Sequence, residues 1–177
     1  MREALRRHIT GSLIVGLLCA VAALVFFAWL ANEVLAGETR GFDEAARSFV
    51  QLGGDREAIE ILANSLEREW DPELVELYGE CRVTDATRQL EQAERWLTRH
   101  NQDAVLLRVL GTLCQRQQLW GKAQTYLEAS LALDNAWRAQ LALGEMLGRL
   151  GRSDEANVHL VAALKLATEE LRHAREV

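Results

Sequence analysis

The feature that constrains this fold most is a set of small residues that recurs at a fixed interval. Gly111 and Gly144 each follow a leucine, and each is followed twelve residues later by an alanine, Ala123 or Ala156. The two copies lie 33 residues apart. Small side chains at a helix crossing let two helix axes approach closely. The interval therefore predicts two helical hairpins of the same construction, stacked one on the other.

The pattern extends beyond these four positions. In each copy another small residue, Ser130 or Ala163, comes seven positions after the alanine. The pattern resembles the tetratricopeptide repeat, a helix–turn–helix unit of about 34 residues. Ala58 and Ala93 mark two weaker copies upstream, and we expect all these small residues to pack helices together. Four units follow, at about 42–69, 71–101, 103–135 and 137–168.

Composition favours helices throughout the repeat region. Ala, Leu, Glu, Arg and Gln dominate it, all of them good helix formers, and Pro72 is the chain's one proline. No strand-like alternation occurs, so the predicted fold class is all-α. The formal net charge of −6 argues against nucleic-acid binding, because duplex affinity comes mainly from Lys and Arg on phosphates. Cys19, Cys81 and Cys114 have neither a disulfide-framework nor a zinc-site spacing, so no metal site is expected.

The N-terminal segment has a different composition. Residues 9–32 contain no Asp, Glu, Lys or Arg, and residues 13–31 form an apolar run. At about 1.5 Å of rise per residue, such a helix matches the ~30 Å hydrocarbon layer. We therefore predict a single transmembrane helix in an anchor domain over 1–36, with lipid contact through 9–35, followed by a repeat domain over 37–177. A cleaved signal peptide is the alternative, although its apolar region would be shorter.

Flanking charge predicts the orientation of this helix. Arg2, Arg6 and Arg7 stand close before the apolar run, whereas Arg40 and Arg47 follow it at a greater distance. Cytoplasmic flanks are enriched in Lys and Arg. The bias predicts a single-pass protein of the bacterial inner membrane with its repeat domain in the periplasm.

The expected partner-binding surface is the concave face that stacked first helices form. The helical period places twelve residues on it. They are Val75, Tyr78, Arg82, Val105, Arg108, Thr112, Gln115, Arg116, Arg138, Leu141, Glu145 and Arg149. Arginine recurs in this set although the chain is acidic overall, and bidentate hydrogen bonds from arginine suit a carboxylate or an acidic peptide. The alternative is that these arginines only keep exposed helices solvated.

Residues 54–166 resemble the C-terminal tetratricopeptide half of HemY-type inner-membrane proteins. Three blocks carry the resemblance, at 74–79, 89–97 and 119–131. It implies a scaffold or coordinator in late haem biosynthesis rather than a catalyst. The family has two N-terminal membrane helices and a longer repeat region, and this chain departs from it in both respects.

Residues 1–47 are similar to the start of membrane phosphatases of the phosphatidic-acid phosphatase type 2 class. The likeness lies in 6–9, 26–30 and 42–45. The catalytic motifs of that class require an Arg-Pro pair and a Pro-Ser-Gly-His block, and Pro72, the single proline, belongs to neither. The likeness therefore supports an anchor and gives no chemistry.

No catalytic motif is found in the sequence. His8, His100, His159 and His173 are not in an HExxH pattern, and no glycine-rich phosphate loop occurs. We expect a membrane-anchored scaffold that binds proteins or peptides, has no cofactor and is not an enzyme. The alternatives are a protein that handles haem or porphyrin, for which His100 or His159 is a candidate ligand, and a remnant of a membrane lipid phosphatase.

Overall fold

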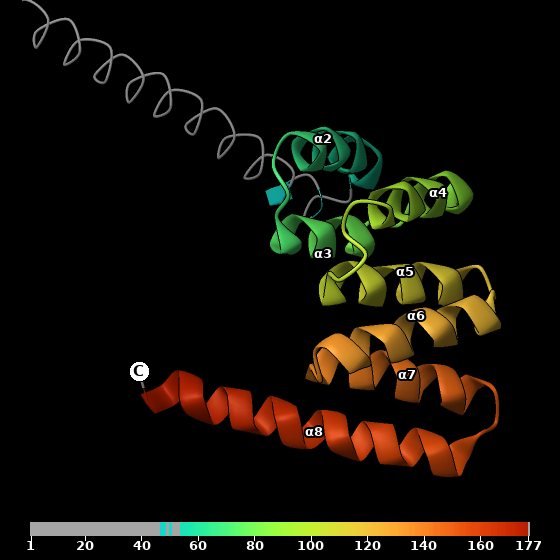
Figure 1. The fold of residues 1–177 in the computed structure, drawn as a ribbon, viewed down its shortest axis with the longest axis vertical. Coiled ribbons are helices and arrows are strands. Elements are labelled where there is room, and N and C mark those ends of the chain that lie inside the picture. The colour runs from blue at the N-terminus through green and yellow to red at the C-terminus, as the bar shows by residue number, and fades with distance from the viewer. Residues whose placement is uncertain (1–46, 49, 51–53, 177) are drawn as a thin grey trace, which may run out of the picture. The chain divides into compact units, whose positions relative to one another are not determined.

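The computed structural model describes residues 47, 48, 50 and 54–176. All regular structure in those residues is helical, and the long helices belong to one compact unit, Ala45–Val177. They are α2 (Asp55–Arg68), α3 (Pro72–Glu80), α4 (Ala86–Leu97), α5 (Ala104–Arg116), α6 (Trp120–Leu133), α7 (Trp137–Arg149) and α8 (Ser153–Glu176), as labelled in Figure 1. The predicted all-α fold class is confirmed for this part of the chain.

Aspartates fix where three of the helices begin. The side chain of Asp71 accepts a hydrogen bond from the Glu73 backbone N–H at 2.8 Å. Asp85 and Asp103 accept from the N–H three residues on, at 3.0 and 2.9 Å. These bonds satisfy N–H groups that have no partner inside the helix. Pro72 takes the first position of α3, where its missing N–H removes no helical bond.

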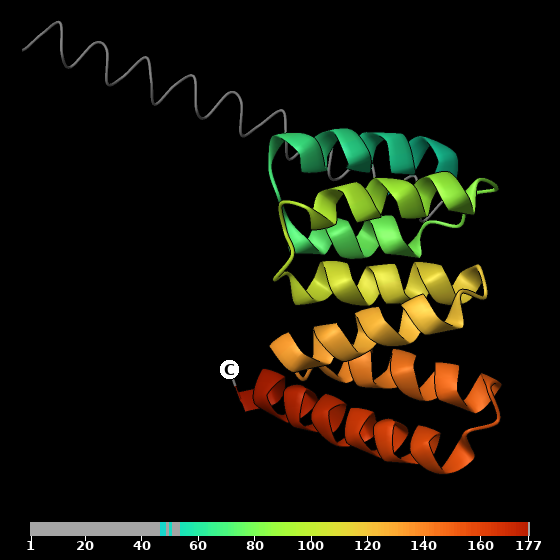
Figure 2. The same cartoon turned by 45° about the vertical axis from the view of Figure 1, so that its right-hand side comes forward.

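Successive helices pack as hairpins that stack in one direction (Figure 1, Figure 2). The pairs α5 with α6 and α7 with α8 are closely packed, while α4 packs on α5 and α6 packs on α7. The first helices α3, α5 and α7 contact one another in sequence, whereas the second helices make no extensive contact with one another. The first helices therefore lie closer together, and the stack curves around them. We call the exposed side of α3, α5 and α7 the inner face.

Glycine sets the helix approach in the two regular hairpins. A Cβ on Gly111 would lie 2.6 Å from Cγ of Leu127 and 3.3 Å from the carbonyl oxygen of the alanine twelve residues later. A Cβ on Gly144 would lie 2.9 Å from Cγ of Leu160 and 3.2 Å from the carbonyl oxygen of the corresponding alanine. Each glycine thus contacts the residues twelve and sixteen positions later. The sequence repeat therefore corresponds to the same packing contact made twice.

The hairpin of α3 and α4 is built differently. The position that corresponds to Gly111 is occupied by Cys81, and α3 makes its close contacts with α2 and α5 rather than with α4. The Tyr78 ring lies against Trp96 (4.7 Å between centroids), and its hydroxyl donates to the carbonyl oxygen of Gln89 (3.1 Å). The close α3–α4 crossing expected at Ala93 is therefore not formed, although Ala93 is fully buried. Without a glycine opposite it, larger side chains fill the space.

Two predictions fall largely outside the described residues. They are the transmembrane helix with its lipid contact through 9–35, and the first helix of the unit 42–69. Among the helices that the structure does describe, none combines the length and the apolar composition that a membrane crossing requires.

Candidate partner-binding face

The inner face is held together by contacts between neighbouring first helices. A Cβ on Gly79 of α3 would lie 2.8 and 2.9 Å from the two methyl groups of Val109 on α5. Nε2 of Gln115 on α5 donates to the carbonyl oxygen of Ala142 on α7 at 2.8 Å. These contacts bring side chains from three units within reach of one another.

Glu76 of α3 binds two arginines, one from each of the next two units. Its Oε1 lies 3.2 Å from Nη2 of Arg108 on α5 and 2.6 Å from Nη1 of Arg138 on α7. That Nη1 also donates to Oε2 at 2.7 Å. The side chains of Glu76 and Arg108 are mostly buried, at 24% and 13% exposure, whereas Arg138 is half exposed. Arg108 and Arg138, predicted to hold a carboxylate, thus hold one that the chain itself supplies.

The surroundings lower the pKa of Arg108 and give the Arg138 guanidinium an aromatic contact. Burial lowers the pKa of Arg108, and the neighbouring Glu76 carboxylate acts in the opposite direction. The guanidinium carbon of Arg138 lies 5.1 Å from the ring centroid of Trp137, at a distance that suits a cation–π contact. A hollow of about 350 Å³ opens beside this cluster, between α5, α7 and α8.

A second arginine pair lies where α3 and α5 end. Partial burial is the main cause of the lowered pKa of Arg116, and the neighbouring Arg82 guanidinium is the next, while the carboxylates of Asp55 and Glu80 act in the opposite direction. Nη1 of Arg116 donates to the carbonyl oxygen of Cys81 at 3.1 Å. In the part of the chain that the structure describes, no carboxylate lies within ion-pair distance of either guanidinium. This pair therefore has donors left for an anion.

Three further residues predicted for the partner face do lie at the surface of α5 or α7. Glu145 and Arg149 are exposed. Thr112 is half-buried, and its hydroxyl donates to the carbonyl oxygen of Arg108 at 3.0 Å. Arg149 ends α7 just as Arg116 ends α5, so basic side chains stand at the same end of successive first helices.

Tyr78, Gln115 and Val75 differ from the expectation that they face a partner. Tyr78 and Val75 are 2% and 0% exposed, and Gln115 is 6% exposed. Tyr78 turns toward α4 because α3 and α4 do not cross closely, and its ring fills the gap between them. Gln115 is occupied by its hydrogen bond to α7. None of the three offers a surface to another protein.

The residues predicted to pack the repeats are all buried. They are Ala58, Ala93, Gly111, Ala123, Ser130, Gly144, Ala156 and Ala163. Ser130 also makes a polar contact, because its Oγ donates to the carbonyl oxygen of Ala104 on the paired helix at 2.7 Å.

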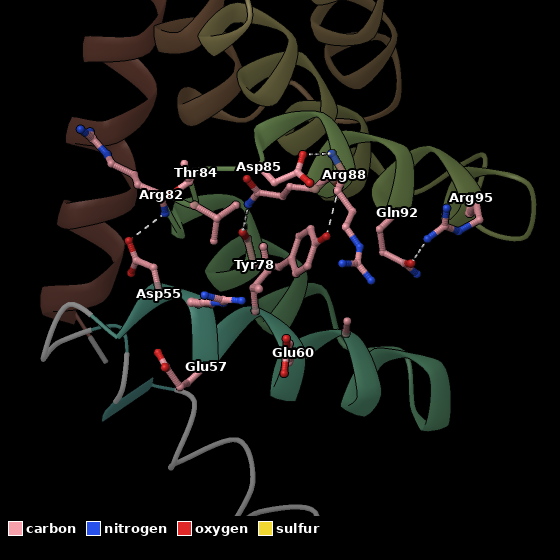
Figure 3. Close-up of a pocket in the computed structure, with 15 residues that line it drawn as sticks. Asp55, Glu57, Glu60, Tyr78, Arg82, Thr84, Asp85, Arg88, Gln92 and Arg95 are labelled. Carbon is pink, nitrogen blue, oxygen red and sulfur yellow. Dashed lines mark hydrogen bonds between the residues drawn. The ribbon is translucent and has the colours of Figure 1, made fainter.

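A larger hollow, of about 620 Å³, lies between the second helices α2 and α4, and Figure 3 shows its side chains. Tyr78 lies at its base, Arg88 extends into it from α4, and Glu57 and Glu60 come from α2. Four acidic and four basic side chains line it, so its formal charge is balanced. It offers no preference for an anionic or a cationic ligand, and we assign it no role.

The rings of the histidines considered for haem already contact other side chains. The His100 ring stacks on Trp70, with 3.7 Å between centroids and 5° between planes. Nδ1 of His159 lies 2.7 Å from Oε1 of Gln140 on the preceding helix. Within the described residues, no three His, Cys, Asp or Glu side chains are grouped so that they could hold a metal ion.

Sequence reasoning missed Glu76, the residue that organises the centre of the inner face. It lies in an acidic helix start with no motif around it, and its partner Arg138 is 62 residues away. No local pattern marks it, and only the packing of α3 on α5 and α5 on α7 identifies its partners.

Solved structures with a similar backbone include tetratricopeptide-type proteins. A structure of MamA matches with a TM-score of 0.57 and 17% identity, over 76% of this chain and 81% of that one. TTC0263, a thermophilic TPR protein of Thermus thermophilus, matches with a TM-score of 0.61 and 22% identity, over 72% and 73%. Identities this low show the fold alone, which is a tetratricopeptide-type helical repeat. No family model matches the chain, and no curated protein does.

Proposed function

We propose that this chain is a membrane-anchored scaffold that binds an acidic segment of a partner protein on its inner face. The Arg82–Arg116 pair is the observation that carries the proposal. Glu76 shows how one carboxylate fits between arginines from two adjacent first helices. Arg116 ends α5, and Arg82 follows the end of α3. Asp55 lies nearby, where its carboxylate accepts from the Arg82 backbone N–H at 2.8 Å, but among the described residues no carboxylate forms an ion pair with either guanidinium. An aspartate or glutamate of a partner would supply the missing anion.

The fold supports protein binding more than it supports catalysis. Stacked helical hairpins present extended curved surfaces that suit peptides and helices. The polar groups of the inner face are arranged as ion pairs and helix-end donors, with no nucleophile and base in the relation that catalysis needs. We therefore propose a function without catalysis.

The anchor and the pathway rest on the sequence. The uncharged run 9–32 supports a bilayer-spanning segment, and the distribution of arginines supports a periplasmic repeat domain at the bacterial inner membrane. The resemblance to HemY-type proteins supports a partner in haem biosynthesis. Fusion of a reporter after the last residue tests the orientation, since a reporter active only in the cytoplasm would contradict it.

Binding of acidic peptide to the full chain in lipid nanodiscs tests the proposed site. The probe is a fluorescein-labelled peptide of alternating Glu and Gly, compared with its Gln-for-Glu counterpart by fluorescence anisotropy. We expect R82E/R116E to weaken binding of the Glu peptide at least about tenfold, because two attractive charges become repulsive. Arg99→Glu, at an exposed arginine beyond the end of α4 and outside the hollow that Arg82 lines, is the matched control. Equal binding of both peptides, or an equal loss in both variants, would contradict the proposal.

The haem-handling alternative makes a different prediction. A haem ligand would shift the Soret band when haemin is titrated into the full chain in detergent. We expect neither His100→Ala nor His159→Ala to change the Soret response, because the His100 ring already stacks on Trp70 and the His159 ring already contacts Gln140. Hydrolysis of a lipid phosphate by the purified chain would instead favour the phosphatase alternative.

A further inference from the structure

The outer side of α8 exposes a run of large apolar side chains. Val158, Val161, Leu164 and Leu171 have exposures of 67%, 53%, 66% and 63%. α8 is the last helix of the stack, as Figure 2 shows. Among the described helices, α7 is the one that packs extensively on α8, so no described helix covers this outer side.

The four apolar side chains form a stripe on one side of α8, which Lys165 and Thr168 interrupt before Leu171. Val158, Val161 and Leu164 follow one another at intervals of three, and Leu171 comes seven residues later, so all four lie within one side of the helix. The buried side of α8 is a different one, which holds Ala156 and Ala163. The helix also has 24 residues, whereas the others have 9 to 14. A helix about 36 Å long results, at about 1.5 Å per residue.

We propose that this stripe binds the same stripe of a second copy of the chain, with the two α8 helices antiparallel. A two-fold axis near the peptide between Leu164 and Lys165 would place Val158 of one copy opposite Leu171 of the other. The same axis would place Asp154 opposite Arg175, because both pairs are symmetric about that peptide. Val158 and Leu171 then meet at both ends of the stripe, Leu164 packs near its own counterpart, and Val161 lies opposite Thr168.

Charge selects the antiparallel arrangement. Asp154 and Arg175 are exposed, and neither has an ion pair among the residues described. Antiparallel pairing gives two Asp154–Arg175 contacts and opposes the helix dipoles. Parallel pairing would put Asp154 against Asp154 and Arg175 against Arg175. The interface is also self-complementary about a two-fold axis, so it closes as a dimer instead of extending into a filament.

A dimer formed in this way would present two inner faces from one assembly. Two linked sites raise the avidity for a partner that carries two acidic segments, without any new contact. The inference does not depend on what the inner face binds, because the stripe and the inner face share no residue.

Disulfide trapping in proteoliposomes tests the arrangement, with Cys19→Ser as the background of the full chain. We expect V158C and L171C chains, reconstituted together, to form a mixed disulfide dimer on mild oxidation. V158C alone should give far less, because its counterpart lies at the other end of the stripe. Glu169→Cys, exposed on α8 but off the stripe, is the control. Efficient trapping of V158C with itself would overturn the antiparallel arrangement.

Sedimentation of the full chain in detergent micelles tests the interface itself. We expect a dimer whose dissociation constant rises at least about tenfold with Leu164→Glu, since a charge enters the apolar seam. Asp154→Arg should weaken the dimer, and adding Arg175→Asp should restore it. Circular dichroism should be unchanged, because the substituted side chains are exposed. A monomeric wild type at roughly 100 µM, or a dimer unaffected by Leu164→Glu, would overturn the proposal.

Discussion

At the scale of single residues, the absence of a side chain determines how this chain packs. Gly111 and Gly144 are buried where a paired leucine and a backbone carbonyl leave no room for a methyl group. The sequence alone was sufficient to find both, because the same contact recurs at the same offsets. It was not sufficient for Ala93, whose unit lacks the glycine and packs instead through Tyr78 and Trp96.

Alanine at position 111 should destabilise the fold. Its Cβ would lie 2.6 and 2.8 Å from Cγ and Cδ2 of Leu127, and a carbonyl oxygen lies at 3.3 Å, so the hairpin must open. We expect Gly111→Ala to lower the free energy of unfolding by roughly 1–3 kcal/mol, measured by urea titration. Gly121→Ala is the control, because a Cβ there meets nothing within 4 Å. A loss as large in the control would show that the effect is not steric.

The two buried cysteines should resist alkylation. Burial is the main cause that raises the pKa of Cys81 and of Cys114 to about 11, so both remain protonated at pH 8. In the full chain with Cys19→Ser, we expect iodoacetamide to label neither thiol at pH 8 unless urea is added. Above pH 9 the unfolded chain loses these protons before the folded one, so stability should fall as pH rises toward 11. Mass spectrometry measures the labelling over time. Complete labelling of either thiol within minutes at pH 8 would contradict its burial.

At the scale of elements, no glycine follows the end of the short helix α3, and a side chain from α4 caps its last carbonyl groups instead. Nε2 of Gln89 donates to the carbonyl oxygens of Tyr78 (2.8 Å) and Cys81 (3.2 Å), which have no partner within α3. Helix starts could be predicted from Asp71, because a capping aspartate is a local signal. This helix end could not, because the residue that satisfies it belongs to another helix.

Removal of the Gln89 amide should weaken the α3–α4 hairpin. Gln89→Leu keeps the buried volume but leaves two carbonyl oxygens with fewer donors, so we expect a loss of roughly 1–3 kcal/mol in unfolding free energy. Hydrogen exchange should accelerate in α3 and α4 more than in α7 and α8, because repeats interact mainly with their neighbours. Gln102→Leu, at an exposed position, is the matched control. Uniform acceleration across all helices would argue against a local effect.

At the scale of the whole molecule, the repeat architecture could be predicted and the centre of the inner face could not. Hairpin packing depends on offsets of twelve and sixteen residues, which a single sequence displays. The Glu76 cluster depends on three helices from three units meeting at one point, with 32 and 62 residues between the carboxylate and its arginines. The curvature of the stack determines which of the many surface arginines reach that carboxylate. No local sequence pattern encodes this choice.

Glu76 should therefore stabilise the stack as a whole. Glu76→Gln removes the charge that faces the mostly buried Arg108, and we expect the free energy of unfolding to fall by roughly 1–3 kcal/mol. Glu73→Gln is the matched control on the same helix, because its pair with Arg47 is exposed on both sides and should contribute less than about 1 kcal/mol. Added salt should shrink the effect of the control more than that of Glu76, since buried pairs are screened less. Equal losses for the two variants in urea titrations would mean that the bridge across three units adds nothing beyond an ordinary surface ion pair.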